Sequence, residues 1–170
     1  MLYVFVEGFD DEFFFTKWFS TVDRIVCVQY SQMKADKVNS YLRSIKQMPY
    51  ADYLFFGDAD GKAIEKKKCL LIENFHELEI NKVVIVQYEI ESWYYAGVSE
   101  TDCQKLKISK FEFCTDGITK EMLNSKMKNP ANRQFVLAKM LDCFSPSLAE
   151  DRNTSYRLFS NYIKKPVAAV

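Results

Sequence analysis

Four short apolar runs, spaced along the first half of the chain, most constrain its fold. They are Leu2–Val6, Arg24–Val28, Tyr53–Phe56 and Lys82–Gln87. Continuous apolar runs of this length are typical of strands that are buried on both faces of a sheet. The segments between them carry apolar residues at helical spacing. Strands that alternate with helices in this way predict a Rossmann-like α/β fold with a parallel four-stranded sheet flanked by helices.

Helices are expected between and after these strands. The intervening segments are Glu12–Ser20, Gln32–Met48, Lys62–Asn74 and Glu89–Tyr95, the last ended by Gly97. Further helices are predicted over Ile118–Lys128, Asn132–Cys143 and Asp151–Ile163, whereas 100–113 has no clear pattern. We therefore expect an α/β core over residues 1–97 and a mostly helical extension over 98–170 that packs on this core.

Composition narrows the classes of function. No apolar run approaches the roughly 20 residues that a membrane helix needs, so no membrane partner is expected. The apolar start, Met1–Val6, lacks a basic leader and predicts a first strand instead of a signal peptide. The five cysteines are scattered, with no Cys-x-x-Cys pair, which favours a reducing cytoplasm. The formal net charge is zero and His76 is the single histidine, so any chemistry is expected to belong to carboxylates.

Acidic residues follow three of the predicted strands. Glu7 follows the first strand, Asp58 and Asp60 the third, and Glu89 and Glu91 the fourth. The carboxyl ends of parallel strands meet at one sheet edge, and an extended backbone would place Asp58 and Asp60 on one face. Neighbouring carboxylates repel unless a proton or cation lies between them, and Mg²⁺ or Mn²⁺ prefers oxygen ligands. The alternative is that Asp-Ala-Asp-Gly forms an ordinary surface turn.

These motifs resemble the TOPRIM domain, the metal-binding module of type IA and type II topoisomerases, bacterial primases and OLD-family nucleases. The resemblance lies in Val6-Glu7-Gly8 followed by Asp11 and an aromatic helix, and in Asp58-Ala-Asp60 after a third strand. Glu89-Ile-Glu-Ser-Trp93 is similar to the Glu-x-Glu-x-Trp motif of small, stand-alone bacterial TOPRIM-like proteins with a helical tail. The TOPRIM resemblance covers roughly the first 97 residues, and the narrower one nearly the whole chain.

The resemblance implies a role for each of these acids. Glu7 matches the general acid or base, and Asp58 and Asp60 match the metal-binding pair. Glu89 and Glu91 would complete a site for Mg²⁺ or Mn²⁺. Asp11 matches a recurrent additional acid, although it could equally be a helix-start residue. The tyrosine domain of topoisomerases and the polymerase region of primases do not fit within 170 residues, which favours a hydrolytic or accessory member.

The functional hypothesis is therefore a Mg²⁺-dependent nuclease acting on DNA or RNA, in bacterial defence or mobile-element biology. Weak candidates for contact with phosphate are Lys62, Lys66, Lys67, Arg133 and Lys139, although a solvated helix face is the more common explanation for each of them. The alternatives are a non-catalytic metal-binding module that serves a partner protein such as an ATPase, and a nucleotide phosphohydrolase. Zero net charge favours the accessory module, because solo nucleases usually present a basic surface.

Overall fold

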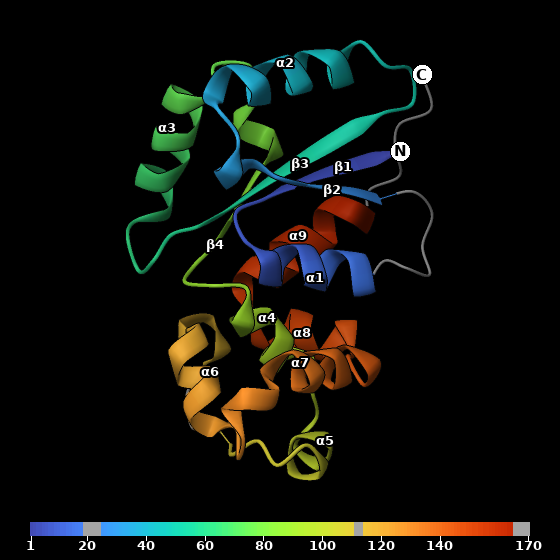
Figure 1. Cartoon of the computed structure of the whole chain (residues 1–170), viewed down its shortest axis with the longest axis vertical. Helices are drawn as coiled ribbons and strands as arrows, with labels where there is room; N and C mark the ends of the chain where they lie inside the picture. The colour runs from blue at the N-terminus through green and yellow to red at the C-terminus, as the bar shows by residue number, and fades with distance from the viewer. Residues whose placement is uncertain (19–24, 111–113, 165–170) are drawn as a thin grey trace. The chain divides into compact units, whose positions relative to one another are not determined.

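The computed structural model describes residues 1–18, 25–110 and 114–164. The chain divides into two compact units, Met1–Gln87 and Tyr88–Val170. The first contains a sheet covered by helices and the second is helical (Figure 1). The predicted α/β class, with a parallel four-stranded sheet and a helical C-terminal part, is confirmed. None of the helices in the described segments is long and apolar enough to cross a membrane.

The sheet has the strand order β2-β1-β3-β4, and every neighbouring pair is parallel. The strands are β1 (Leu2–Val6), β2 (Ile25–Gln29), β3 (Asp52–Asp58) and β4 (Val83–Val86). Phe5 of β1 lies opposite Val28 of β2 on one side and Phe55 of β3 on the other. The predicted start of the second strand, Arg24, lies outside the described residues.

Helices cover both faces of this sheet, which explains why its strands are apolar throughout. Helix α1 (Phe9–Trp18) lies on one face, and α2 (Ala35–Lys46) and α3 (Ile64–Asn74) lie on the other (Figure 1). Neighbouring residues of β3 show the alternation: the Phe56 ring lies 4.6 Å from that of Phe15 in α1, whereas the Phe55 ring lies 5.2 Å from that of Phe75. Each face therefore has its own aromatic contacts.

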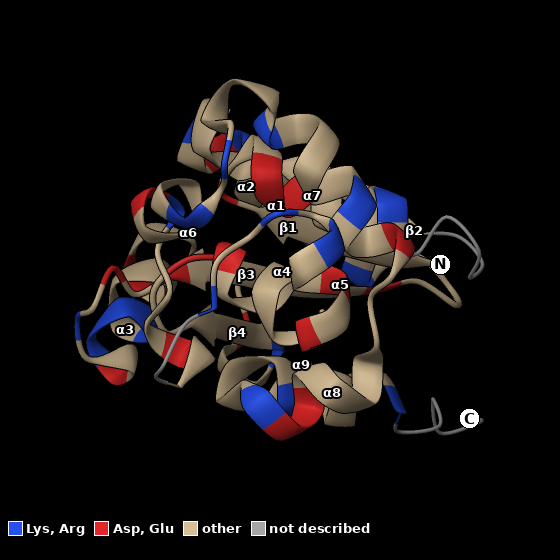
Figure 2. Ribbon diagram, turned by 90° about the horizontal axis from the view of Figure 1, so that it is seen from below, with Lys and Arg blue, Asp and Glu red and all other residues tan. Residues whose placement is uncertain are grey.

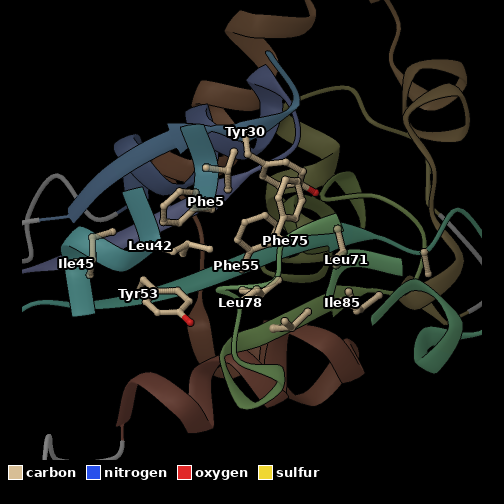
Figure 3. Packing of buried hydrophobic residues seen from close by; sticks show 13 residues of the cluster. Phe5, Tyr30, Leu42, Ile45, Tyr53, Phe55, Leu71, Phe75, Leu78 and Ile85 are labelled. Carbon is tan, nitrogen blue, oxygen red and sulfur yellow. The ribbon is translucent and has the colours of Figure 1, made fainter. Parts of the chain in front are cut away.

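The core between the sheet and helices α2 and α3 is built largely from aromatic rings. Phe5 and Phe55 stack with ring centroids 5.4 Å apart, and the Tyr30 ring lies 4.3 Å from that of Phe55 (Figure 3). Leu42 and Ile45 of α2 fill the same cluster and are almost fully buried. Side chains of this size each contribute about 1.5–3 kcal/mol when buried, so this layer anchors the strand ends that carry the candidate site.

The second unit is organised around Trp93. Its helices are α4 (Glu91–Ala96), α5 (Glu100–Lys105), α6 (Lys120–Lys126), α7 (Arg133–Asp142), α8 (Pro146–Arg152) and α9 (Thr154–Lys164). The fully buried Trp93 ring stacks on Phe159 with centroids 5.2 Å apart, and it meets the Tyr156 ring edge-on at 5.2 Å. Trp93 therefore holds α4 against α9.

The predicted final helix over Asp151–Ile163 corresponds to α9, but its predicted start is too early, because the chain leaves helical geometry at Asn153. Its backbone is extended (φ −134°, ψ 121°), which separates α8 from α9. The Asn153 side-chain oxygen accepts the Tyr156 backbone N–H at 2.9 Å and so caps α9. Asparagine favours such capping positions over helix interiors because its side chain competes for backbone hydrogen bonds.

Candidate functional site

The strand order reverses between β1 and β3. From β1 the chain passes through α1 to β2 on one side, and β3 then pairs with β1 on the other. In open parallel sheets, ligands bind at such a reversal of strand order, outside the carboxyl ends. Glu7 directly follows β1 and Asp58 is the last residue of β3. Two of the predicted site residues thus flank the reversal.

Glu7 lies at the centre of a hydrogen-bonded group that joins three elements. Its Oε2 atom accepts the Asp58 backbone N–H at 3.3 Å and the Tyr30 hydroxyl at 3.1 Å. The Lys67 ammonium donates to the same oxygen at 3.2 Å. These bonds fix the carboxylate, yet its side chain remains 39% exposed. We refer to Glu7, Tyr30, Asp58 and Lys67 as the strand-end cluster.

The environment of the Tyr30 hydroxyl shows that several acids share this region. Burial is the largest effect that raises the Tyr30 pKa, followed by the nearby charge of Glu7, with smaller effects from Asp58 and Asp11. The hydroxyl therefore stays protonated and acts as the donor to Glu7. Tyr30 begins η2 (Tyr30–Gln32), directly after β2. Nothing in the local sequence pattern distinguishes Tyr30 from an ordinary core aromatic, so its contact with Glu7 could not be predicted.

Asp11 is a buried acid next to this cluster. Its Oδ2 atom accepts the Gly8 backbone N–H at 2.9 Å, which closes the first turn leading into α1. Burial raises the pKa of Asp11 to about 7, and the neighbouring charges of Glu7 and Asp10 add to this effect. This hydrogen bond at the start of α1 is the contact expected of a helix-start residue, the alternative interpretation of Asp11. The raised pKa also allows the carboxyl to hold or release a proton near neutral pH.

Asp60 does not continue the strand, so the prediction that it shares a face with Asp58 by strand alternation does not hold. β3 ends at Asp58, and Asp60 is exposed with φ 51°, followed by Gly61 at φ 73°. The turn is held to β4 by Ala59 N–H donating to the Val86 carbonyl at 2.9 Å. Asp60 therefore lies in a turn, as the alternative interpretation of this segment had it.

Glu89 and Glu91 are bound within the second unit. The Glu89 carboxylate accepts the backbone N–H of Lys120, the first residue of α6. Glu91 is buried and forms an ion pair with Arg133 of α7. These contacts give both acids a structural role. Their role in completing the cation site stays a prediction.

The predicted phosphate-binding residues differ in their surroundings. Lys62 and Lys66 are both exposed; Lys62 precedes α3 and Lys66 lies within it. The basic residues of α3 are blue in Figure 2. Arg133 contacts Glu91, and its side chain is only 12% exposed. Lys139 pairs with Asp142 at 3.0 Å and lies 5.8 Å above the Phe135 ring. Of the lysines named from the sequence, Lys67 is the one with a contact in the strand-end cluster.

Carboxylate oxygens, the ligand type that Mg²⁺ prefers, lie on two residues at this sheet edge. Among the described residues, no group of three or more His, Cys, Asp and Glu side chains could hold a metal ion. The five-acid site stays a prediction, since Glu89 and Glu91 belong to the second unit. Mg²⁺ commonly binds through one or two carboxylates and keeps several waters. Glu7 and Asp58 each bring a carboxylate to the ends of neighbouring strands, and the Asp58 backbone N–H donates to Glu7 Oε2 at 3.3 Å.

Comparison with known proteins identified no relative of this chain. No protein-family model matches the chain, and neither the curated proteins nor the solved structures include a significant match. The resemblance to TOPRIM proteins consequently rests on the short motifs of the sequence.

Proposed function

We propose that the strand-end cluster is the active site of a Mg²⁺-dependent TOPRIM-type hydrolase that cleaves phosphodiester bonds in DNA or RNA. One observation carries the proposal: Glu7 and Asp58 lie together at the reversal of strand order, where α/β sheets bind ligands, and Glu7 remains open to water. The five cysteines form no disulfide, which is consistent with a reducing bacterial cytoplasm as the setting.

The residues of the cluster suit this chemistry in distinct ways. A bound Mg²⁺ would lower the pKa of a coordinated water and stabilise charge on the phosphoryl oxygens. Glu7 would accept a proton from the attacking water, and the Tyr30 hydroxyl keeps its carboxylate oriented. Asp58 would hold the cation together with Glu7. Lys67 supplies a positive charge at the same edge for the phosphate of the substrate.

A second candidate function is a metal-binding accessory module for a partner protein such as an ATPase. It is favoured by the zero formal net charge, since a solo nuclease usually presents a basic surface. A nucleotide phosphohydrolase would use the same residues on a smaller substrate. Activity assays separate these functions, since only the accessory module binds a cation without hydrolysing any phosphate ester.

The test is a cleavage assay on the full chain with Mg²⁺ or Mn²⁺. Labelled single- and double-stranded DNA and RNA, together with nucleoside triphosphates, are incubated with wild type, Glu7→Gln and Asp151→Asn. Glu7→Gln keeps an acceptor for Tyr30 but loses the base, so we expect a loss of about 100-fold. Asp151 is exposed in α8, and its variant should retain wild-type rates. Equal rates for wild type and Glu7→Gln would contradict the proposal.

A further inference from the structure

Lys67 is the basic residue of the strand-end cluster. Its ammonium lies 3.2 Å from Glu7 Oε2, and its side chain is 15% exposed. The same oxygen also accepts Tyr30 and the Asp58 N–H, so the ammonium completes a set of three donors. Lys67 therefore occupies the side of the carboxylate that faces α3.

The backbone of β3 is shaped for this lysine. A Cβ atom on Gly57 would lie 3.2 Å from Lys67 Cε and 3.0 Å from Leu71 Cδ1, both tighter than ordinary contacts. The stem of Lys67 therefore packs closely against Gly57, and a Cβ atom there would force it to move by a few tenths of an ångström. Neighbouring lysines of the same run behave differently: Lys68 pairs with Glu65 at 3.6 Å and Lys66 is exposed. Contact with Glu7 thus distinguishes one lysine of the run.

A divalent cation at the same carboxylate would be repelled by this ammonium. Two positive charges within a few ångströms repel strongly in a partly buried site, where water screens them incompletely. Resting on the proposed metal site, we infer that Lys67 is the counter-cation of Glu7 in the metal-free protein and that a divalent cation binds by displacing its ammonium. The displaced ammonium stays tethered by α3 at the sheet edge, where a substrate phosphate would be its new partner.

This exchange predicts an effect of Lys67 on metal affinity that opposes its effect on substrate binding. A residue that merely supported the fold would lower both when it is removed. A competitor raises the affinity for the cation when its charge is removed, since Glu7 then lacks its internal partner. Affinity for the cation can be measured without any substrate, so it is independent of hydrolysis.

The experiment titrates Mg²⁺ and Mn²⁺ into wild type, Lys67→Met, Lys67→Arg and Lys66→Met by calorimetry. Thermal unfolding with and without Mg²⁺ is followed in parallel. We expect Lys67→Met to bind the cation about ten-fold more tightly, whereas Lys67→Arg and Lys66→Met remain near wild type. Without metal, Lys67→Met should unfold at a lower temperature than wild type, and Mg²⁺ should restore it, because ligands that bind the folded state stabilise it.

The outcomes separate this inference from the proposed function. Tighter binding by Lys67→Met without hydrolysis by wild type would support the exchange and overturn the hydrolase. Unchanged or weaker binding by Lys67→Met, with metal-dependent hydrolysis by wild type, would overturn the exchange alone. An absence of metal binding in both proteins would overturn both. If Lys67→Met does not fold, Lys67→Gln replaces it. Tighter cation binding by Lys67→Gln than by wild type supports the exchange, and equal binding overturns it.

Discussion

Glu91 of α4 and Arg133 of α7 form an ion pair inside the helical unit, although 42 positions separate them in sequence. The Glu91 side chain is 3% exposed and that of Arg133 is 12% exposed. Removing one partner leaves a buried charge without compensation, which commonly costs about 3–5 kcal/mol. We expect Arg133→Met to lower the free energy of unfolding by this amount, as measured by urea unfolding with tryptophan fluorescence.

The matched comparison for this pair is the double variant Glu91→Gln/Arg133→Met. Since it removes both charges, it should be more stable than Arg133→Met alone. The same stability for single and double variants would show that the two charges do not depend on each other.

The raised pKa of Asp11 should make the stability of the metal-free protein depend on pH. Its pKa is raised from 3.8 to about 7 in the folded state, mainly by burial, so the folded protein binds this proton more tightly than the unfolded chain. The Asp11 contribution is therefore fully present below its unfolded pKa, falls as the pH rises toward about 7, and is lost above that. Asp11→Asn stays neutral and should be the more stable protein above neutral pH.

Urea unfolding of wild type and Asp11→Asn between about pH 5 and about pH 9 in EDTA checks this sign. Asp36→Asn is the control, because Asp36 is exposed in the first turn of α2. Parallel stability curves for wild type and Asp11→Asn would show that the carboxyl is not preferentially protonated in the fold.

Asn153 and Ser155 make a buried polar network that should be sensitive to truncation. Trp93 Nε1 donates to Ser155 Oγ at 2.7 Å, and Ser155 Oγ donates to Asn153 Oδ1 at 2.8 Å. Ser155→Ala removes the acceptor of a buried indole N–H, which costs about 1–3 kcal/mol. Asn153→Ala also removes the cap of α9 and should cost more. Unfolding free energies within about 0.5 kcal/mol of wild type for both variants would contradict the network.

Two glycines of the helical unit provide a matched pair. A Cβ on Gly97 would lie 2.2 Å from Phe144 Cε2, whereas a Cβ on Gly117 would meet nothing within 4 Å. Overpacking of this kind costs about 1–3 kcal/mol, so Gly97→Ala should lower the unfolding temperature by several degrees. Gly117→Ala should leave it nearly unchanged. Thermal unfolding followed by circular dichroism measures both, and equal shifts would rule out the Phe144 contact as the cause.

The sheet could be predicted from sequence because its strands are buried on both faces, which produces unbroken apolar runs. The run Leu2–Val6 matches β1 directly, and the acids Glu7 and Asp58 were placed correctly at strand ends. Local rules fail where one residue changes the backbone. Asp60 turns away with a positive φ, and Asn153 ends one helix and caps the next.

Other features of the site depend on contacts between distant segments. Tyr30 reaches Glu7 because β2 lies beside β1, and Lys67 reaches it from α3, passing close to Gly57. The burial of Glu91 likewise depends on its partner in another helix. No local periodicity or motif encodes such pairings.

The most direct test of the central claim is a calorimetric titration of Mg²⁺ into wild type, Asp58→Asn and Asp151→Asn. Asp58 ends β3 beside Glu7, whereas Asp151 is exposed in α8. If the strand-end cluster holds the cation, wild type and Asp151→Asn bind Mg²⁺ alike and Asp58→Asn binds at least about ten-fold more weakly, as expected when a hard cation loses a carboxylate ligand. Equal affinity in all three proteins, or no binding by wild type, would contradict a cation site between β1 and β3.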